Sequence, residues 1–254
     1  MASQLSHPAT PPARPSAALR WLRLGVVAFV LAMVGWRWDA QTGFTALIRF
    51  GDNFETTRLP AIRSLPLTSF AGAGYDGQFY AQLAVDPHFT APEVQTALDN
   101  PAYRARRIGL SLLAHGLGCG SPWWTLQVYA LLNTAAWLLF AWLCWREIGA
   151  GDLRGTLRWC AIVLGLGALD SVRLSLTDLP AALLILLAVR SARRTRSALA
   201  AGWLVLAGFA RETAILALPG LWRGAVRSWS GRVRSRKAVP RSRALPAPPR
   251  ASSG

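Results

Sequence analysis

Long apolar runs separated by short polar stretches dominate the chain. Three runs approach the roughly 20 residues that a helix needs to cross about 30 Å of hydrocarbon: Trp21–Trp38, Trp124–Trp145 and Ala198–Leu221. Two shorter runs, Trp159–Leu169 and Leu179–Val189, flank the polar junction DSVRLSLTDLP. We interpret residues 157–190 as a helical hairpin whose tip reaches the far interface. The pattern therefore predicts an all-α fold, a polytopic transmembrane helical bundle of about five spans.

The longest polar stretch, residues 39–107, separates the first two spans and contains GAGYDGQFYAQLAVDP. Its segment QFYAQLAV predicts about two turns of helix, with Phe79 and Leu83 on one face, as in a helix lying in the headgroup layer. Residues 108–117 are apolar but too short to span, which predicts an interfacial or re-entrant helix. Amphipathic surface helices are therefore expected in this first loop.

Arginines next to the spans predict the orientation of the bundle. Cytoplasmic loops carry an excess of Lys and Arg, so the arginine-rich segments before the first span and before the last span are expected inside. The loop 39–107 and the hairpin tip are then outside. The arginines that decide this orientation are Arg14, Arg20, Arg23, Arg190, Arg193, Arg194 and Arg196.

Composition supports lipid as the solvent. Only 16% of the residues are charged and 52% are hydrophobic, whereas soluble domains carry about 25% charged residues. Lys and Arg outnumber Asp and Glu 28 to 12, but they flank apolar runs, so no nucleic-acid partner is expected. The three cysteines show no zinc or disulfide spacing. We divide the chain into a disordered lead (1–19), a membrane domain (20–222) and a basic, disordered tail (223–254).

Asp76 is the main candidate for chemistry because it stands between Gly74 and Gly77 in the polar loop. A carboxylate at this point can cap the helix that follows it. It can equally serve as a general base, or as the ligand of a divalent cation at the membrane surface. The neighbouring polar side chains Tyr75, Gln78 and Tyr80 are candidate supporting residues.

Two arginines follow on the predicted outer side. Arg104 and Arg107 are three residues apart and share one helical face. They can snorkel to lipid headgroups. Alternatively, they can hold the phosphate of a lipid-linked donor, which suits the planar donor fork of arginine.

Further ionisable residues occur within or beside predicted spans, where they are costly and usually paired or functional. At the hairpin tip, Asp170, Arg173 and Asp178 can close an internal ion pair. Arg211 and Glu212 lie in the middle of the last predicted span, where packing against Asp170 or Asp178 would neutralise them. Arg173 and Arg211 are also candidate donor-phosphate ligands, with Asp178 and Glu212 as supporting residues.

Four stretches occur in an order that resembles a known family: GYDGQFY, LDNPAYRARRIGLSLLA, SLTDLPAALLILLA and ARETAILALPGL. The family consists of bacterial multi-pass membrane proteins related to the GT-C glycosyltransferases, and the resemblance covers about Trp21 to Trp222. It implies location in the inner membrane, a polyprenyl-phosphate sugar as lipid partner, and sugar transfer on the outer face. It also implies that Asp76, the acidic residue of the first outer loop, serves catalysis or binds a divalent cation.

The chain departs from the GT-C pattern in helix number and in its acidic residues. It has fewer helices, no C-terminal outer domain, and no acidic partner close to Asp76, since Asp86 and Asp99 are ten or more residues away. These departures favour an alternative, a truncated or non-catalytic membrane protein that acts as an assembly partner. A transporter is a third interpretation, although the two related halves common in transporters are not visible.

Overall fold

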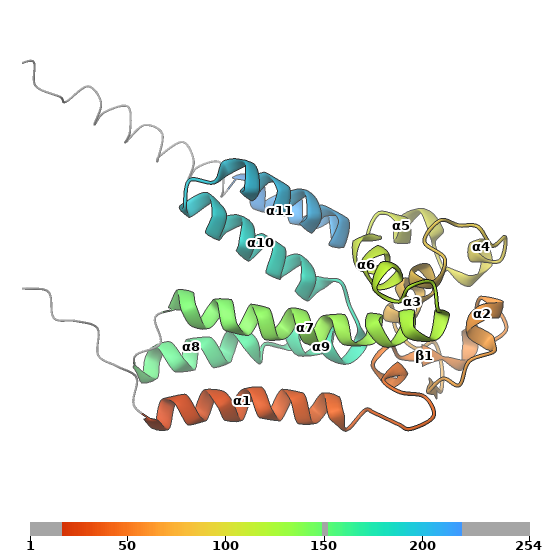
Figure 1. Ribbon diagram of the computed structural model, residues 1–254, viewed down its shortest axis with the longest axis horizontal. Helices are drawn as coiled ribbons and strands as arrows, with labels where there is room; N and C mark the ends of the chain where they lie inside the picture. Colours follow the sequence, from red (N-terminus) through yellow and green to blue (C-terminus); the bar gives the residue numbers. More distant parts are fainter. Residues whose placement is uncertain (1–16, 149–151, 220–254) are drawn as a thin grey trace, which may run out of the picture.

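The computed structural model describes residues 17–148 and 152–219 of the 254-residue chain. These residues form a predominantly helical molecule with two parts, an elongated helical bundle and a smaller globular part that we call the cap (residues 36–121) (Figure 1). The predicted tail at 223–254 lies outside the described residues. Most of the predicted disordered lead does so too, but its last residues, Ala17 to Leu19, belong to the first helix.

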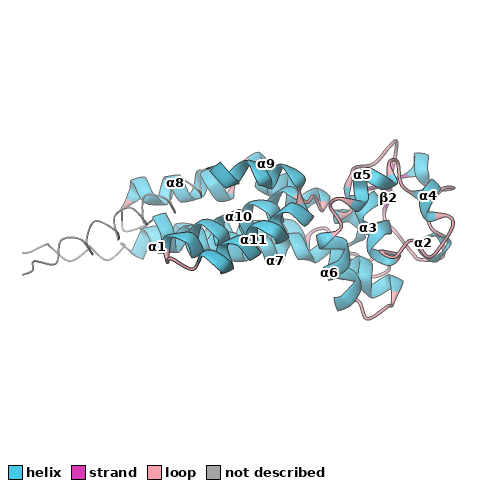
Figure 2. Ribbon diagram, turned by 90° about the horizontal axis from the view of Figure 1, so that it is seen from above, coloured by secondary structure: helices cyan, strands magenta, loops and turns pink. Residues whose placement is uncertain are grey.

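The bundle helices run alternately toward the cap and away from it (Figures 1 and 2). One pass is made by two short helices, α8 and α9, that follow each other along α7. The bundle elements are α1 (Ala17–Gly35), α7 (Pro122–Ile148), α8 (Leu153–Val163), α9 (Leu166–Leu174), α10 (Asp178–Arg193), α11 (Ser197–Ala210) and the 3-10 helix η3 (Glu212–Ala217).

Within the described residues, α1 and α7 are the helices that are both long and apolar enough to cross a membrane. α11 is apolar but has only 14 residues. At about 1.5 Å per residue, the 27 residues of α7 extend over roughly 40 Å. α7 is therefore longer than a hydrocarbon core, and its first turns are packed inside the cap against α3 and α6.

The predicted helical hairpin at 157–190 is present, but its helices begin and end at other residues than expected. Its first arm is interrupted at Gly165, which has extended backbone angles (φ −55°, ψ 142°) and separates α8 from α9. Trp137 Nε1 donates to the Val163 carbonyl at 2.8 Å and satisfies an acceptor that the interruption frees. The polar junction is mostly helical, because α9 continues to Leu174 and only Ser175 to Thr177 form the turn.

The prediction of one continuous helix over Ala198–Leu221 is wrong for the part of this range that the structure describes, up to residue 219. α11 ends at Ala210, Arg211 is extended (φ −157°, ψ 123°), and η3 follows. Arg211 and Glu212 therefore lie at a helix end beside the cap and not in the middle of a span. Arg211 forms an ion pair with Asp178, and Glu212 forms one with Arg107. Each charge therefore has a partner of opposite charge, which it would lack in the middle of an apolar span.

The cap is built from short elements wrapped around one central helix, α3. Its two strands pair in parallel, with Phe50 opposite Ser69 and Gly51 opposite Phe70, a small exception to the all-α prediction. The cap elements are η1 (Thr45–Leu47), β1 (Phe50–Gly51), η2 (Asp52–Phe54), α2 (Pro60–Arg63), β2 (Ser69–Phe70), α3 (Gly77–Val85), α4 (Val94–Ala97), α5 (Pro101–Ala105) and α6 (Gly109–Leu117).

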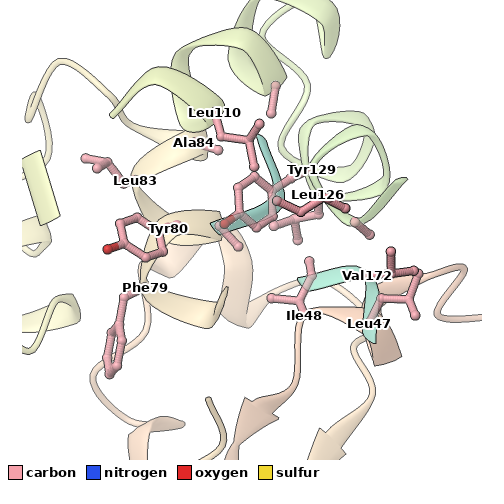
Figure 3. Close-up of a cluster of buried hydrophobic side chains, with 14 of the residues drawn as sticks. Leu47, Ile48, Phe79, Tyr80, Leu83, Ala84, Leu110, Leu126, Tyr129 and Val172 are labelled. Atoms are coloured by element: carbon pink, nitrogen blue, oxygen red, sulfur yellow. The ribbon is translucent and has the colours of Figure 1, made fainter. Parts of the chain in front are cut away.

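Helix α3 forms where the sequence predicts it, but it is not a surface helix. Every residue from Gly77 to Ala84 is buried, and the helix packs against α6 and α7. Figure 3 shows Tyr80 and Leu83 among side chains of the core cluster that come from α6, α7 and α9. The expectation of a headgroup-layer helix fails because both faces of α3 are covered by other parts of the chain.

Helix α6 matches the prediction of a short, non-spanning helix at residues 108–117. Its residues Leu110 and Ala114 are buried against α3 and α7, while Leu112, Leu113 and Leu117 are exposed. This one-sided burial makes α6 the amphipathic helix of the cap. It lies next to the point where the chain enters α7.

Candidate functional site

Two glycines of the GAGYDGQF sequence fix the position of the loop that carries Asp76. Gly74 has a positive φ of 66°, and an added Cβ would collide with the backbone of Gly51. A Cβ at Gly77 would collide with the Leu174 carbonyl oxygen at the end of α9. These close approaches place Asp76 where the cap meets the α9–α10 turn.

Gln78, a predicted supporting residue, is fully buried and holds the same loop. Its Oε1 accepts from the Gly51 amide at 3.0 Å, and its Nε2 donates to the Ala73 carbonyl at 2.7 Å. Tyr75 takes part through its backbone amide, which donates to the Arg49 carbonyl at 3.0 Å, while its side chain is exposed. Both residues therefore position the loop.

Asp76 occupies the N-cap position of α3, but its side chain makes no capping hydrogen bond. Its Oδ1 accepts instead from Arg104 Nη2 at 3.0 Å. The side chain is 51% exposed. The sequence leaves two interpretations of Asp76 open, helix capping and a functional carboxylate. The side chain does not cap the helix, and it is a half-exposed carboxylate held by an arginine.

Arg104 is buried, with 3% of its side chain exposed, and it holds a second carboxylate as well. Its Nε and Nη2 donate to both oxygens of Asp99 at 2.8 and 2.6 Å, and its guanidinium lies 4.9 Å from the ring centres of Phe79 and Tyr80. Burial lowers the pKa of Arg104, but hydrogen bonds to Asp99 and Asp76 outweigh it and hold the pKa above its ordinary value. The same hydrogen bonds lower the pKa of Asp99.

Asp99 is the functional candidate that the sequence interpretation missed, because it is distant from Asp76 along the chain. A local signal for it exists in the sequence DNPAYR. Asn100 Oδ1 accepts from the Tyr103 amide at 3.1 Å and starts the short helix α5, with Pro101 in its first turn. Asp99 then lies just before the helix and Arg104 one turn into it, so the two side chains meet.

Arg107 forms the second ion pair of the site, with a residue from the far end of the described chain. Its Nε and Nη2 donate to Glu212 at 2.6 and 2.5 Å, and its Nη1 lies 3.5 Å from the hydroxyl of Tyr80. This bidentate contact raises the pKa of Arg107 and lowers that of Glu212 to about 2. Tyr80, predicted as a supporting residue, lies between the two arginines, and burial raises its pKa.

The remaining candidates form separate pairs. Arg211 is paired with Asp178 at the start of α10, which is one of the alternatives that the sequence leaves open. Arg173 is paired at 3.5 Å with Asp170 within α9, so this pair does not close the hairpin, and both side chains are exposed. The structure therefore brings together Asp76, Arg104, Arg107 and Glu212 through Tyr80 and the shared ion pairs, and leaves Arg173 in a contact of its own.

The charges of the site are arranged with the cations inside. Arg104 and Arg107 are almost fully buried, whereas the side chains of Asp99 and Glu212 are 39% and 41% exposed and that of Asp76 is exposed further. A ligand that approaches from solvent therefore meets carboxylates first. In the predicted phosphate clamp of Arg104 and Arg107, the Nε and Nη2 donors of both residues are engaged by these carboxylates, whereas Arg104 Nη1 is buried without a hydrogen-bond partner.

An apolar groove of about 620 Å³ lies beside this site, between α6, α7, α10 and α11. Its wall is made almost entirely of aliphatic and aromatic side chains, among them Leu113, Leu132, Leu139, Leu183 and Phe209. Gly109 and Ala210 also line it, and each is two residues from a member of the Arg107–Glu212 pair. The groove therefore extends to the charged site.

The acidic residues fit a divalent cation only in part. Within residues 17–148 and 152–219, no group of three or more His, Cys, Asp or Glu side chains is arranged to hold a metal ion. Asp76 and Asp99 accept from the same Arg104 nitrogen, so their carboxylates are neighbours. Mg²⁺ is commonly bound by one or two carboxylates together with substrate phosphates and water, and this pair matches that pattern.

No protein-family model, no curated protein and no solved structure matches the chain. The resemblance to GT-C glycosyltransferases therefore rests on the four stretches of sequence quoted above. What it implies about activity and location enters below as a proposal.

Proposed function

We propose that the chain is an integral membrane glycosyltransferase-like protein that transfers a sugar from a polyprenyl-phosphate donor on the outer face of the bacterial inner membrane. One observation carries the proposal. A half-exposed carboxylate, Asp76, is held by the buried Arg104 next to a second carboxylate, Asp99, close to an apolar groove. This combination supports the proposal, because a general base or a cation ligand would then lie near a surface that suits a lipid chain.

The arrangement of the helices supports a membrane location with the cap outside. We assign the five passes to α1, α7, α8 with α9, α10, and α11. Arginines collect at the bundle end that lies away from the cap, as expected for a cytoplasmic face. They are Arg20, Arg23, Arg146, Arg154, Arg158, Arg190, Arg193, Arg194 and Arg196. At the cap end of α1, Trp36 and Trp38 are exposed, which is typical of an interfacial belt.

The groove is the proposed site of the prenyl chain. Its volume falls within the range of about 300–1,000 Å³ that is usual for ligand sites, and its apolar wall suits a hydrocarbon. A chain that lies in it has its phosphate at the level of Arg107 and Glu212, toward Asp76. Arg107 is therefore the arginine that we assign to the donor phosphate, and Arg104 is a positioning residue for Asp76 and Asp99.

The proposed reaction is a displacement at the anomeric carbon of the donor sugar. The acceptor hydroxyl oxygen forms the new bond to this carbon, the bond from carbon to phosphate oxygen breaks, and the polyprenyl phosphate leaves. Asp76 accepts the hydroxyl proton as a general base. In the alternative role, Asp76 would instead hold a divalent cation together with Asp99, and the cation would supply neutralisation of charge on the departing phosphate.

The proposal is tested by sugar transfer from a labelled polyprenyl-phosphate donor in proteoliposomes. Asp76→Asn is expected to lower the transfer rate at least about 100-fold, the lower range for loss of a general base. Asp170→Asn is the matched control, because Asp170 is exposed and paired only with Arg173. Equal transfer by wild type and Asp76→Asn would contradict the catalytic role.

A non-catalytic membrane component is the second candidate. The observation that favours it is that the arginines of the site are already neutralised, since Arg104, Arg107 and Arg211 each have a carboxylate partner. Such a saturated network suits a scaffold that holds the cap on the bundle. Absence of transfer by the wild-type protein with all donors tested, together with intact assembly, would favour this candidate.

A further inference from the structure

Helices α6 and α11 touch at the end of the apolar groove that lies nearest to the charged site. At Gly109 an added Cβ would lie 3.1 Å from the Phe209 carbonyl oxygen, so the start of α6 touches the end of α11. Arg107 precedes α6 and Glu212 follows α11, and their ion pair bridges these two segments of the chain. Because Gly109 and Ala210 line the groove, a ligand whose head leaves the groove at this end lies close to the Arg107–Glu212 pair.

The edge of Arg107 that is formed by Nε and Nη2 already holds an anion. This edge, the one that binds oxyanions with two parallel hydrogen bonds, is taken by Glu212. The guanidinium also lies 4.4 Å from the ring centre of Tyr103, and Nη1 faces the Tyr80 hydroxyl. Because a phosphate uses the same two-nitrogen edge as a carboxylate, the two compete for Arg107.

We propose that Glu212 is a specificity-determining gate residue that occupies the anionic headgroup position on Arg107 and leaves when a phosphate-bearing lipid binds. This inference rests on the proposed function, because it assumes that a prenyl phosphate uses the groove. Glu212 then selects for ligands whose head carries an oxyanion able to replace it. A prenyl alcohol enters the groove but leaves the Arg107–Glu212 pair closed.

The position of Glu212 suits a group that moves. It is the first residue of η3, directly after the extended Arg211, so it is not part of a regular α-helix. Its carboxylate is 41% exposed, which means that it can turn toward solvent without becoming buried and unpaired. Arg107, in contrast, is buried, packs on the ring of Tyr103 and faces the Tyr80 hydroxyl, so it remains in place to receive the phosphate.

The test compares binding of geranylgeranyl phosphate to the full-length protein in nanodiscs across four variants. Glu212→Gln removes the competing charge with little change in shape and is expected to bind about tenfold more tightly than wild type. Arg107→Gln is expected to bind about tenfold more weakly. Glu147→Gln, which breaks an equivalent ion pair with Arg190 at the opposite end of the bundle, is the matched control and is expected to bind like wild type.

Geranylgeraniol, the matching alcohol, is expected to bind wild type and Glu212→Gln equally. The side chain of Glu212→Asp is too short to keep both hydrogen bonds to Arg107, so this variant tests the gate a second time. It is expected to bind the phosphate more tightly than wild type and more weakly than Glu212→Gln. Wild-type binding that is unchanged or weakened by Glu212→Gln and Glu212→Asp would overturn the gate and leave the proposed function standing. Failure of both wild type and Glu212→Gln to bind the phosphate would overturn both.

Discussion

At the scale of single residues, the arginines of the site are the inner groups and the carboxylates the outer ones, whereas an arginine clamp presents its guanidinium groups to the ligand. The cations are buried and support carboxylates that face outward. Aromatic rings surround Arg104, and its hydrogen bonds to Asp76 and Asp99 replace the water that burial removes. The sequence predicts both Asp76 and Arg104 as candidate site residues on the same side of the bundle. It does not reveal that Arg104 has a second partner, because a contact across five residues depends on where α5 begins.

The first prediction concerns the shape of this cation. Arg104→Lys keeps the charge but cannot bind Asp99 with two parallel hydrogen bonds while it also holds Asp76. We expect a loss of about 2 kcal/mol in the free energy of unfolding. Thermal unfolding in detergent measures it, with Arg173→Lys as the control at an exposed pair. Equal melting temperatures for the two variants would contradict the structural role of Arg104.

The second prediction concerns pH. Arg104 lowers the pKa of Asp99 in the folded protein, so the ionised carboxylate contributes stability above its unfolded pKa of roughly 4. That stability is lost as the pH falls through the lower, folded pKa. The difference in melting temperature between wild type and Asp99→Asn is therefore expected to be largest near neutral pH and to shrink below about pH 4. A difference that grows on acidification would contradict the Asp99–Arg104 pair.

At the scale of elements, the sequence predicts where helices form better than what covers them. The position of α3 is predicted closely, but its burial is not, because Gln78 and Gln82 read as polar surface positions. In the structure both side chains are buried and satisfied by loop backbone, for example Gln82 by the Leu59 amide and the Ala97 carbonyl. The last span is mispredicted because apolar periodicity continues past Ala210, while the ion pairs that accompany the break at Arg211 involve residues far away in sequence.

A third prediction follows from how α3 docks on the bundle. Gly77→Ala would bring a Cβ against the Leu174 carbonyl oxygen, which would displace α3 and with it Asp76. Reduced thermal stability and loss of transfer activity are expected together. Gly116→Ala in α6 is the matched control, because a Cβ at position 116 has no neighbouring atom within 4 Å. We expect this variant to be as stable as wild type or slightly more stable. Wild-type behaviour of both variants would contradict the tight contact between α3 and α9.

At the scale of the whole molecule, the cap and the arginine-rich end lie at opposite ends of the bundle (Figure 1). The alternation of helices brings the arginine clusters at the start of α1 and at the end of α10 to the same end of the bundle, as the order of the runs requires. The orientation of this bundle in a membrane stays a prediction. The paths of α8 and α9 and the end of α11 depend on contacts between helices, so they could not be derived from the order alone.

This orientation gives a fourth prediction. Cys119 is exposed in the cap, so a membrane-impermeant maleimide added to cells with a permeabilised outer membrane is expected to label it. Cys119→Ser removes this signal and provides the background for Ser197→Cys, at the exposed start of α11 on the other end. Position 197 is expected to react only after the inner membrane is opened. Labelling of position 197 before position 119 would reverse the proposed topology.

The separation of charges along the bundle has a consequence for the response of the protein to voltage. In a membrane with a negative interior, each arginine at the inner end lies at the favourable side of the potential. The difference between the two sides is about 2.3 kcal/mol per elementary charge for 100 mV. The exposed carboxylates of the cap lie at the side that favours anions. The cap, residues 36–121, has seven Asp or Glu residues and seven Arg residues, so the field acts mainly on the arginine-rich end. In the proposed orientation, the membrane potential would therefore favour the same direction of insertion as the arginine pattern.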